Sequence, residues 1–167
     1  MNDFDRKIRE ILPEGLVSSD IRLLQINLGR HCNLSCAHCH LECSPLRREQ
    51  MAWEVMEGIL ATIGGRAFDR IDITGGSPEL HPHFRTFLSK LRAQGHSVQV
   101  RTNLTNLAEP PLSDLIPFFR SLRISLVGSL PCYEKENVDR QRGSGVHGKS
   151  IAALRLLNQA GYGLDDD

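Results

Sequence analysis

Four short apolar runs with β-strand character alternate along this chain of 167 residues with segments of helical periodicity. The expected strands are residues 21–28, 70–74, 97–104 and 122–128. Strands that are separated by helices form parallel sheets, because each helix carries the chain back to the end at which the previous strand began. The alternation therefore predicts an α/β fold, with helices around a parallel sheet that is either barrel-like or doubly wound.

The segments between these strands place apolar residues on one helical face. The expected helices are residues 49–63, about 82–94, 112–119 with an interruption at Pro117, and about ten residues that end at Gly161. In the first helix, Ala52 and Val55 are among the residues assigned to the buried face. Residues 131–147 are polar and are expected to form a loop before the last helix.

Composition and charge exclude several classes of function. Lys and Arg together number 20, and so do Asp and Glu, so no net field draws the chain toward nucleic acid. No apolar run approaches the roughly 20 residues that a membrane helix needs. The charged N-terminal residues lack the apolar core of a secretory signal. We therefore expect a cytoplasmic protein without a nucleic-acid or membrane partner.

Four of the five cysteines lie within twelve positions, at Cys32, Cys36, Cys39 and Cys43. An odd number of bunched cysteines without an export signal argues against a disulfide framework and favours metal or redox chemistry. The first three have the spacing C-x3-C-x2-C. Three thiolates leave one iron of a [4Fe–4S] cluster without a protein ligand, and that iron can take the amino and carboxylate groups of a bound molecule.

The cysteine spacing alone leaves a zinc site open. A structural zinc ion takes four ligands, and the fourth would come from His31, His38, His40 or Cys43. The positions of the other unusual motifs favour the cluster. Each follows an expected strand, and in parallel α/β folds the carboxyl ends of the strands gather the chemistry at one edge.

The segment GGSPE, residues 75–79, follows the second strand. Glycine allows positive φ and close approach of the backbone to a neighbouring group. The cysteine loop and this glycine turn, each after a strand, together resemble the radical SAM (S-adenosylmethionine) superfamily. The resemblance implies an enzyme with a partial (β/α)6 barrel, of which about four β/α units are present. His38 departs from it, because many members carry an aromatic residue at that position.

The segments LGRHCNLSCAHCH, IDITGGSPELHPHFR, VRTNLT and SLPCYEKENVDRQRGSGV resemble the arsenosugar-biosynthesis group of this superfamily, the ArsS proteins. That likeness implies transfer of the 5′-deoxyadenosyl group of SAM to trivalent dimethylated arsenic. It also implies a [4Fe–4S] cluster, SAM, an arsenical substrate, and an electron donor such as flavodoxin or ferredoxin.

The resemblance assigns roles to individual residues. The expected cluster ligands are Cys32, Cys36 and Cys39, and the expected SAM-binding residues are Gly75, Gly76, Ser77, Glu79, Asn103, Ser125 and Arg142. Among the latter, the glycine turn would bind the methionine end of SAM. Ser125 and Arg142 are the candidates for the SAM carboxylate, since related enzymes place a Ser after the fourth strand and an Arg in the following loop.

Cys132 follows the fourth strand and is the candidate catalytic residue. Trivalent arsenic is soft, and thiolates select soft metals and metalloids. Cys132 would hold the arsenical beside the adenosyl group. The alternative is a small, inert cysteine, and Cys43 is expected only to pack beside the cluster loop.

Residues 143–150, GSGVHGKS, match the P-loop pattern and open a helix. A P-loop directly follows its strand, whereas this segment follows a long polar stretch. The remaining chain is also too short for the rest of a nucleotide-binding sheet. A glycine-rich loop before a helix explains the match, and we set the nucleotide site aside.

We expect an N-terminal lead-in over residues 1–20 and a radical SAM core domain over residues 21–167 that is incomplete at its C-terminus. The Cys-rich C-terminal domain of the arsenosugar group is expected to be absent. Two other interpretations stay open at this point. One is a radical SAM enzyme that acts on a peptide or thiol compound, and the other is a non-catalytic metal-binding fragment.

Overall fold

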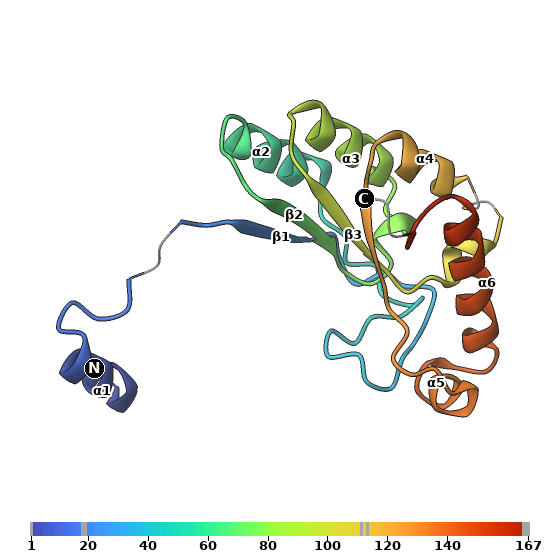
Figure 1. The fold of residues 1–167 in the computed structure, drawn as a ribbon, viewed down its shortest axis with the longest axis horizontal. Coiled ribbons are helices and arrows are strands. Elements are labelled where there is room, and N and C mark those ends of the chain that lie inside the picture. The colour runs from blue at the N-terminus through green and yellow to red at the C-terminus, as the bar shows by residue number, and fades with distance from the viewer. Residues whose placement is uncertain (1, 18–19, 111, 113, 165–167) are drawn as a thin grey trace.

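A four-stranded parallel sheet forms the centre of the computed structural model, which describes residues 2–17, 20–110, 112 and 114–164. The strands are β1 (Leu23–Asn27), β2 (Arg70–Thr74), β3 (Val98–Thr102) and β4 (Ser125–Gly128), and they lie in chain order across the sheet (Figure 1). All three strand pairs are parallel. The predicted α/β fold with four β/α units is confirmed.

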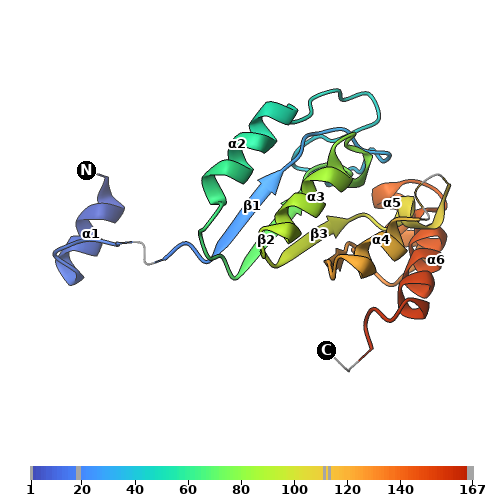
Figure 2. The same ribbon diagram turned by 90° about the horizontal axis from the view of Figure 1, so that it is seen from above.

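The helices are α1 (Asp3–Ile11), α2 (Trp53–Ile63), α3 (Phe84–Ala93), α4 (Leu115–Ser121), α5 (Lys135–Arg142) and α6 (Val146–Gln159), with short 3-10 turns η1 (Pro78–Leu80) and η2 (Thr105–Ala108). Figure 2 shows α2 and α3 lying along one face of the strands. Further along the chain, α6 packs against η2 and α5. Helix α1 stands apart from the sheet and buries none of its side chains (Figure 1).

The two faces of the sheet differ in character. Ile26, Ile71 and Val100 belong to the apolar core under the helices. Because side chains alternate along a strand, their neighbours point to the opposite face. There Asp72 of β2 accepts hydrogen bonds from Gln25 of β1 at 2.8 Å and from Gln99 of β3 at 3.0 Å. The face that α2 and α3 leave uncovered therefore carries a polar network across three strands.

Three details of the predicted elements are corrected. The expected loop 131–147 contains α5, a very polar helix whose sequence has too little apolar periodicity to predict it. Pro117 lies in the first turn of α4 and does not interrupt it, because the N–H that proline lacks has no helical partner at that position. Helix α2 begins at Trp53 and leaves Val55 52% exposed, so residues 49–52 and Val55 do not belong to its buried face.

Candidate cofactor site

A cavity of about 270 Å³ opens at the carboxyl ends of the strands. Its lining includes all four cysteines of the loop, at Cys32, Cys36, Cys39 and Cys43, together with Leu34, His38, His40, Thr74, Gly75, Gly76, Arg101, Thr102, Asn103, Ser129 and Arg142. The structure thus brings together motifs that follow four different strands, as parallel α/β topology requires.

The cysteine loop is fixed at its base by backbone hydrogen bonds. The Cys32 N–H donates to the carbonyl oxygen of Ser44 at 3.2 Å, and the Ser44 N–H donates to Arg30 at 3.3 Å. Farther out, the Ala37 N–H donates to the carbonyl oxygen of Gln141 in α5 at 2.8 Å. The loop is therefore held both by its own ends and by the helix that follows β4.

The glycine turn after β2 packs on the chain that leads into the cysteine loop. The N–H of Gly76 donates to the carbonyl oxygen of Gly29 at 2.9 Å, and the N–H of Ser77 donates to that of His31 at 2.9 Å. Gly75 has φ 139°, which favours glycine, and a Cβ there would lie 2.8 Å from the Gly29 oxygen. Glycine is needed here because two stretches of backbone meet.

A hydrogen-bonded cluster of small polar side chains supports the first cysteine. The side-chain oxygen of Asn33 accepts from Ser77 Oγ and from Asn103 Nδ2, both at 2.8 Å. Ser77 Oγ lies 3.3 Å from the sulfur of Cys32, and Asn33 Nδ2 donates to Thr105 Oγ1 at 2.7 Å. Ser77 and Asn103, both predicted to bind SAM, therefore contact the residues that hold the loop in place.

Arg142 is the buried cation of the site. It ends α5, and only 8% of the residue is exposed. Its Nη1 donates to the carbonyl oxygen of Ser129 at 2.8 Å, which anchors α5 to the end of β4. Its Nε is buried without a hydrogen-bond partner within the described part of the chain. A buried guanidinium with a free donor suits an anionic group in the cavity.

The thiols of the loop differ in their affinity for protons. Burial raises the pKa of Cys36, and the nearby Arg142 partly offsets this rise. Burial also acts on Cys39, but hydrogen bonds from the backbone of the following residues outweigh it and lower the pKa of Cys39. Burial and the adjacent Cys39 thiol raise the pKa of Cys43. Of these three thiols, Cys39 is the one whose pKa the structure lowers.

The donor set fits an iron–sulfur cluster in its chemistry. Thiolates are the usual protein ligands of such clusters, and the three spaced cysteines line one cavity. Among the described residues, no group of three or more His, Cys, Asp or Glu side chains is already arranged around a common metal position. His31 does not line the cavity, and its Nδ1 lies 3.0 Å from the carbonyl oxygen of Arg47.

Glu79 does not line this cavity. It is buried, and its Oε1 accepts from Thr102 Oγ1 at 3.0 Å and from Asn106 Nδ2 at 3.4 Å, while its Oε2 has no partner among the described residues. Burial raises the pKa of Glu79. Its contacts join η1 to β3 and η2, so its location gives it a positioning role and no contact with the cavity.

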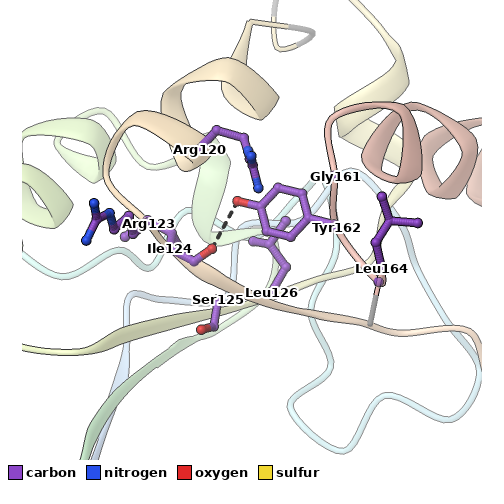
Figure 3. Close-up of a pocket in the computed structure, with 9 residues that line it drawn as sticks. Arg120, Arg123, Ile124, Ser125, Leu126, Gly161, Tyr162 and Leu164 are labelled. Atoms are coloured by element: carbon purple, nitrogen blue, oxygen red, sulfur yellow. Dashed lines mark hydrogen bonds between the residues drawn. The ribbon is translucent and has the colours of Figure 1, made fainter. Parts of the chain in front are cut away.

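Ser125 is also placed elsewhere. It is the first residue of β4, whereas Ser129, just past the end of that strand, lines the cysteine cavity. Ser125 lines a separate cavity of about 820 Å³ with Tyr162 and Arg120 (Figure 3). In Figure 3 the Tyr162 hydroxyl donates to the carbonyl oxygen of Ile124, at 3.0 Å. The structure therefore does not bring Ser125 to the cofactor cavity, because Ser125 begins β4 and the cavity opens at the other, carboxyl end of the strands.

Cys132 lies in the turn between β4 and α5 and does not line the cysteine cavity. Its sulfur accepts from the N–H of Glu134 at 3.4 Å and from Asn137 Nδ2 at 3.7 Å, both at the start of α5. The turn in which it lies leads into the helix that carries Arg142.

The P-loop-like segment has a local structural role. The carboxylate of Asp139 accepts from the N–H groups of Gly145 at 3.0 Å and His147 at 2.9 Å, at the start of α6. A side-chain carboxylate therefore occupies the helix end at which a P-loop binds phosphate. Lys149 instead pairs with Glu109 at 2.6 Å.

Two residues of the site, Asn33 and Arg101, were not predicted from the sequence. Asn33 connects the cysteine loop to the turns after β2 and β3. Its position inside the C-x3-C motif is the one signal in the sequence that could have identified it. Arg101 lines the cavity and donates to the buried Asp72 at 2.8 Å. The alternation of β3 placed Arg101 away from the core, but no local signal paired it with Asp72.

Several known proteins are similar to this chain in sequence. The model of the family described as the Radical SAM superfamily matches residues 26–164. The antilisterial bacteriocin subtilosin biosynthesis protein AlbA of Bacillus subtilis (strain 168) is 27% identical over 135 residues, which cover 80% of this chain and 30% of AlbA. The 7-carboxy-7-deazaguanine synthase of Neisseria meningitidis serogroup B is 34% identical over 87 residues, which cover 52% of this chain and 38% of the synthase. The matched regions span about a third of the length of these relatives.

Solved structures share the fold. SuiB of Streptococcus suis bound to S-adenosylmethionine superposes with a TM-score of 0.71 at 20% identity, over 93% of this chain and 36% of SuiB. The anSMEcpe protein with bound AdoMet gives a TM-score of 0.66 at 19% identity, over 84% of this chain and 42% of that protein. Within the described residues, no helix is long and apolar enough to cross a membrane.

Proposed function

This chain belongs to the radical SAM superfamily, whose enzymes use a [4Fe–4S] cluster and SAM, and we propose that Cys32, Cys36 and Cys39 are its cluster ligands. The observation that carries the proposal is that these three thiols line one cavity with the glycine turn and Arg142. Residues 21–167 make up the core domain in this proposal, and the lead-in before them takes no part in the site.

The bound cluster would supply the electron that cleaves SAM into methionine and a 5′-deoxyadenosyl radical. The residues of the chain bind and orient SAM for that step. The backbone of Gly75 and Gly76 would receive the amino group of the methionine end. The free Nε of Arg142 would donate to the carboxylate, held in place by the bond from Nη1 to Ser129.

Other predicted residues act through their neighbours. Ser77 and Asn103 hold Asn33 and the Cys32 sulfur in position. Glu79 ties the turn after the glycine pair to β3. Ser125 has no role in this proposal, because it lines another cavity.

For the substrate, we propose a trivalent dimethylated arsenical that receives the 5′-deoxyadenosyl group. The support is the resemblance of four segments of the sequence to the arsenosugar-biosynthesis group. Cys132 is half-buried in the turn before α5, and its thiol is of the type that binds soft arsenic. An electron donor such as flavodoxin or ferredoxin would reduce the site.

A peptide is the second candidate substrate. AlbA acts in the biosynthesis of the bacteriocin subtilosin, and SuiB has been solved with its precursor peptide SuiA. A peptide substrate would not depend on the Cys132 thiol. The two candidates therefore differ in one residue that can be replaced without touching the cysteine cavity.

The experiment compares Cys132→Ala with the unchanged protein after anaerobic cluster reconstitution. Each is incubated with SAM, dithionite and a trivalent dimethylated arsenical, and products are separated by liquid chromatography with arsenic-specific detection. The proposal predicts an adenosylated arsenical from the unchanged protein and at least tenfold less from Cys132→Ala, with 5′-deoxyadenosine still formed by both. SAM cleavage without any arsenic adduct would favour the peptide candidate.

A further inference from the structure

The fourth cysteine of the loop folds back onto the third. The N–H of Glu42 donates to the carbonyl oxygen of Cys39 at 3.0 Å, which closes a tight turn. Glu42 adopts φ 51°, in the left-handed region that reverses the chain direction. The N–H of Cys43 then donates to the Cys39 sulfur at 3.4 Å.

Cys32 and Cys132 have other partners. Cys32 contacts Ser77 and receives the N–H of Leu34 at 3.4 Å. Cys132 lies in the turn before α5, and its sulfur contacts residues of that turn. A backbone turn also joins Cys36 to Cys39, because the Cys39 N–H donates to the carbonyl oxygen of Cys36 at 3.1 Å. Within the described residues, however, only in the Cys39–Cys43 pair does the N–H of one cysteine donate to the sulfur of the other.

The two thiols of this pair differ in access to solvent. Cys43 is buried, with 5% of its surface exposed, whereas Cys39 is partly exposed at the cavity. An oxidant from solvent therefore reaches the Cys39 thiol first, and Cys43 lies next to it in the folded chain. This is the arrangement of an attacked thiol and a resolving thiol.

We propose that Cys39 and Cys43 form a reversible disulfide when the cluster is absent. The inference goes beyond the proposed function and rests on it in one respect, namely that Cys39 is a cluster ligand. The disulfide would remove the Cys39 thiolate, so the oxidised chain would have only two of the three cysteine ligands that the cluster needs. A thiol reductant would return the site to its cluster-binding state.

The oxidant is hydrogen peroxide. The Cys39 sulfur attacks one peroxide oxygen, the O–O bond breaks, and water and a sulfenic acid form after proton transfer. The Cys43 sulfur then attacks the Cys39 sulfur, the S–S bond forms, and the hydroxyl group leaves as a second water with the Cys43 proton. The two sulfurs lose two electrons in total, and the peroxide gains them.

The test uses the full chain, freed of metal by chelation under argon and treated with one equivalent of hydrogen peroxide. Remaining thiols are blocked with N-ethylmaleimide before digestion without reductant. Cleavage after glutamate separates residues 43–49 from the upstream fragment that carries the other three loop cysteines. Mass spectrometry then reports whether these two fragments are joined. Variants Cys32→Ala, Cys36→Ala, Cys39→Ala and Cys43→Ala assign the bond.

The proposal predicts joined fragments in the unchanged protein and in Cys32→Ala and Cys36→Ala, and separate fragments in Cys39→Ala and Cys43→Ala. Dithiothreitol should separate them and restore iron uptake. Joined fragments in Cys39→Ala, or no joined fragments in the unchanged protein, would overturn it. Iron uptake by the untreated, reduced protein is measured in parallel. Its absence would contradict the proposed cluster site and leave the disulfide result standing by itself.

Discussion

Gly76 packs against the carbonyl oxygen of His31, the residue before the first cysteine of the loop. A Cβ on Gly76 would come closer than 3.0 Å to this oxygen, a contact that real Cβ atoms essentially never show. The next residue, Ser77, donates its N–H to the same oxygen at 2.9 Å. The glycine turn after β2 thus packs directly against the start of the cysteine loop.

Replacing Gly76 with alanine should therefore disturb the fold and the site together. We expect Gly76→Ala to lower the free energy of unfolding by about 1–3 kcal/mol, the usual cost of overpacking. Gly58→Ala is the matched control, because Gly58 lies in α2 and a Cβ there meets no atom within 4 Å. It should stabilise the protein by about 0.5–1 kcal/mol. Urea unfolding of both variants measures the difference, and equal effects would contradict this account.

The sequence predicted this region well for a physical reason. Cysteine spacing, paired glycines and strand periodicity are local signals, and parallel topology brings the ends of the strands together. The same local signals fail where a role depends on distant partners. Glu79 and Arg101 form hydrogen bonds with residues of other strands, and no spacing along the chain predicts those contacts.

Boundaries were the second source of error. The sequence predicts a fourth strand over residues 122–128, with Ser125 in its middle, whereas β4 begins at Ser125 itself. A shift of a few residues in the strand boundary moves a side chain from the middle of a strand to its start, away from the end at which the cavity lies. Helix α5 was missed because its residues are almost all polar, although Arg142 in it was identified.

Glu79 should make the stability of the protein depend on pH. Its pKa is raised from the ordinary value of 4.5 by burial, so the folded state holds its proton more tightly than the unfolded chain. That contribution to stability is fully present below the unfolded pKa and is lost as pH rises through the raised folded pKa. Glu79→Gln keeps an acceptor for Thr102 and cannot ionise, so this part of the loss should disappear.

Thermal unfolding of the unchanged protein and Glu79→Gln at several pH values above 4.5 provides the measurement. The difference between the two melting temperatures should shift in favour of Glu79→Gln as pH rises. A difference that stays constant with pH would show that Glu79 ionises normally. Glu79→Ala should be less stable at every pH, by about 1–3 kcal/mol, because it leaves buried donors without an acceptor.

Arg142 should control the affinity for SAM. A lysine there keeps the charge but lacks the second donor that anchors the side chain to Ser129. We expect Arg142→Lys to weaken SAM binding about tenfold, which corresponds to about 1.4 kcal/mol. Ser125→Ala is the control and should bind SAM as the unchanged protein does, since Ser125 lines the other cavity. Equilibrium dialysis with labelled SAM on the reconstituted proteins compares them, and a weakened Ser125→Ala would return that residue to the site.

The most direct test of the cluster site is electron paramagnetic resonance of the anaerobically reconstituted, dithionite-reduced protein with and without SAM. We predict a reduced [4Fe–4S] signal that changes on addition of SAM. The signal should be lost in Cys36→Ala and kept in Cys132→Ala, whose thiol lies outside the cysteine cavity. A protein that binds zinc and takes up no iron, or a signal that survives in Cys36→Ala, would contradict the assignment of Cys32, Cys36 and Cys39 as the cluster ligands.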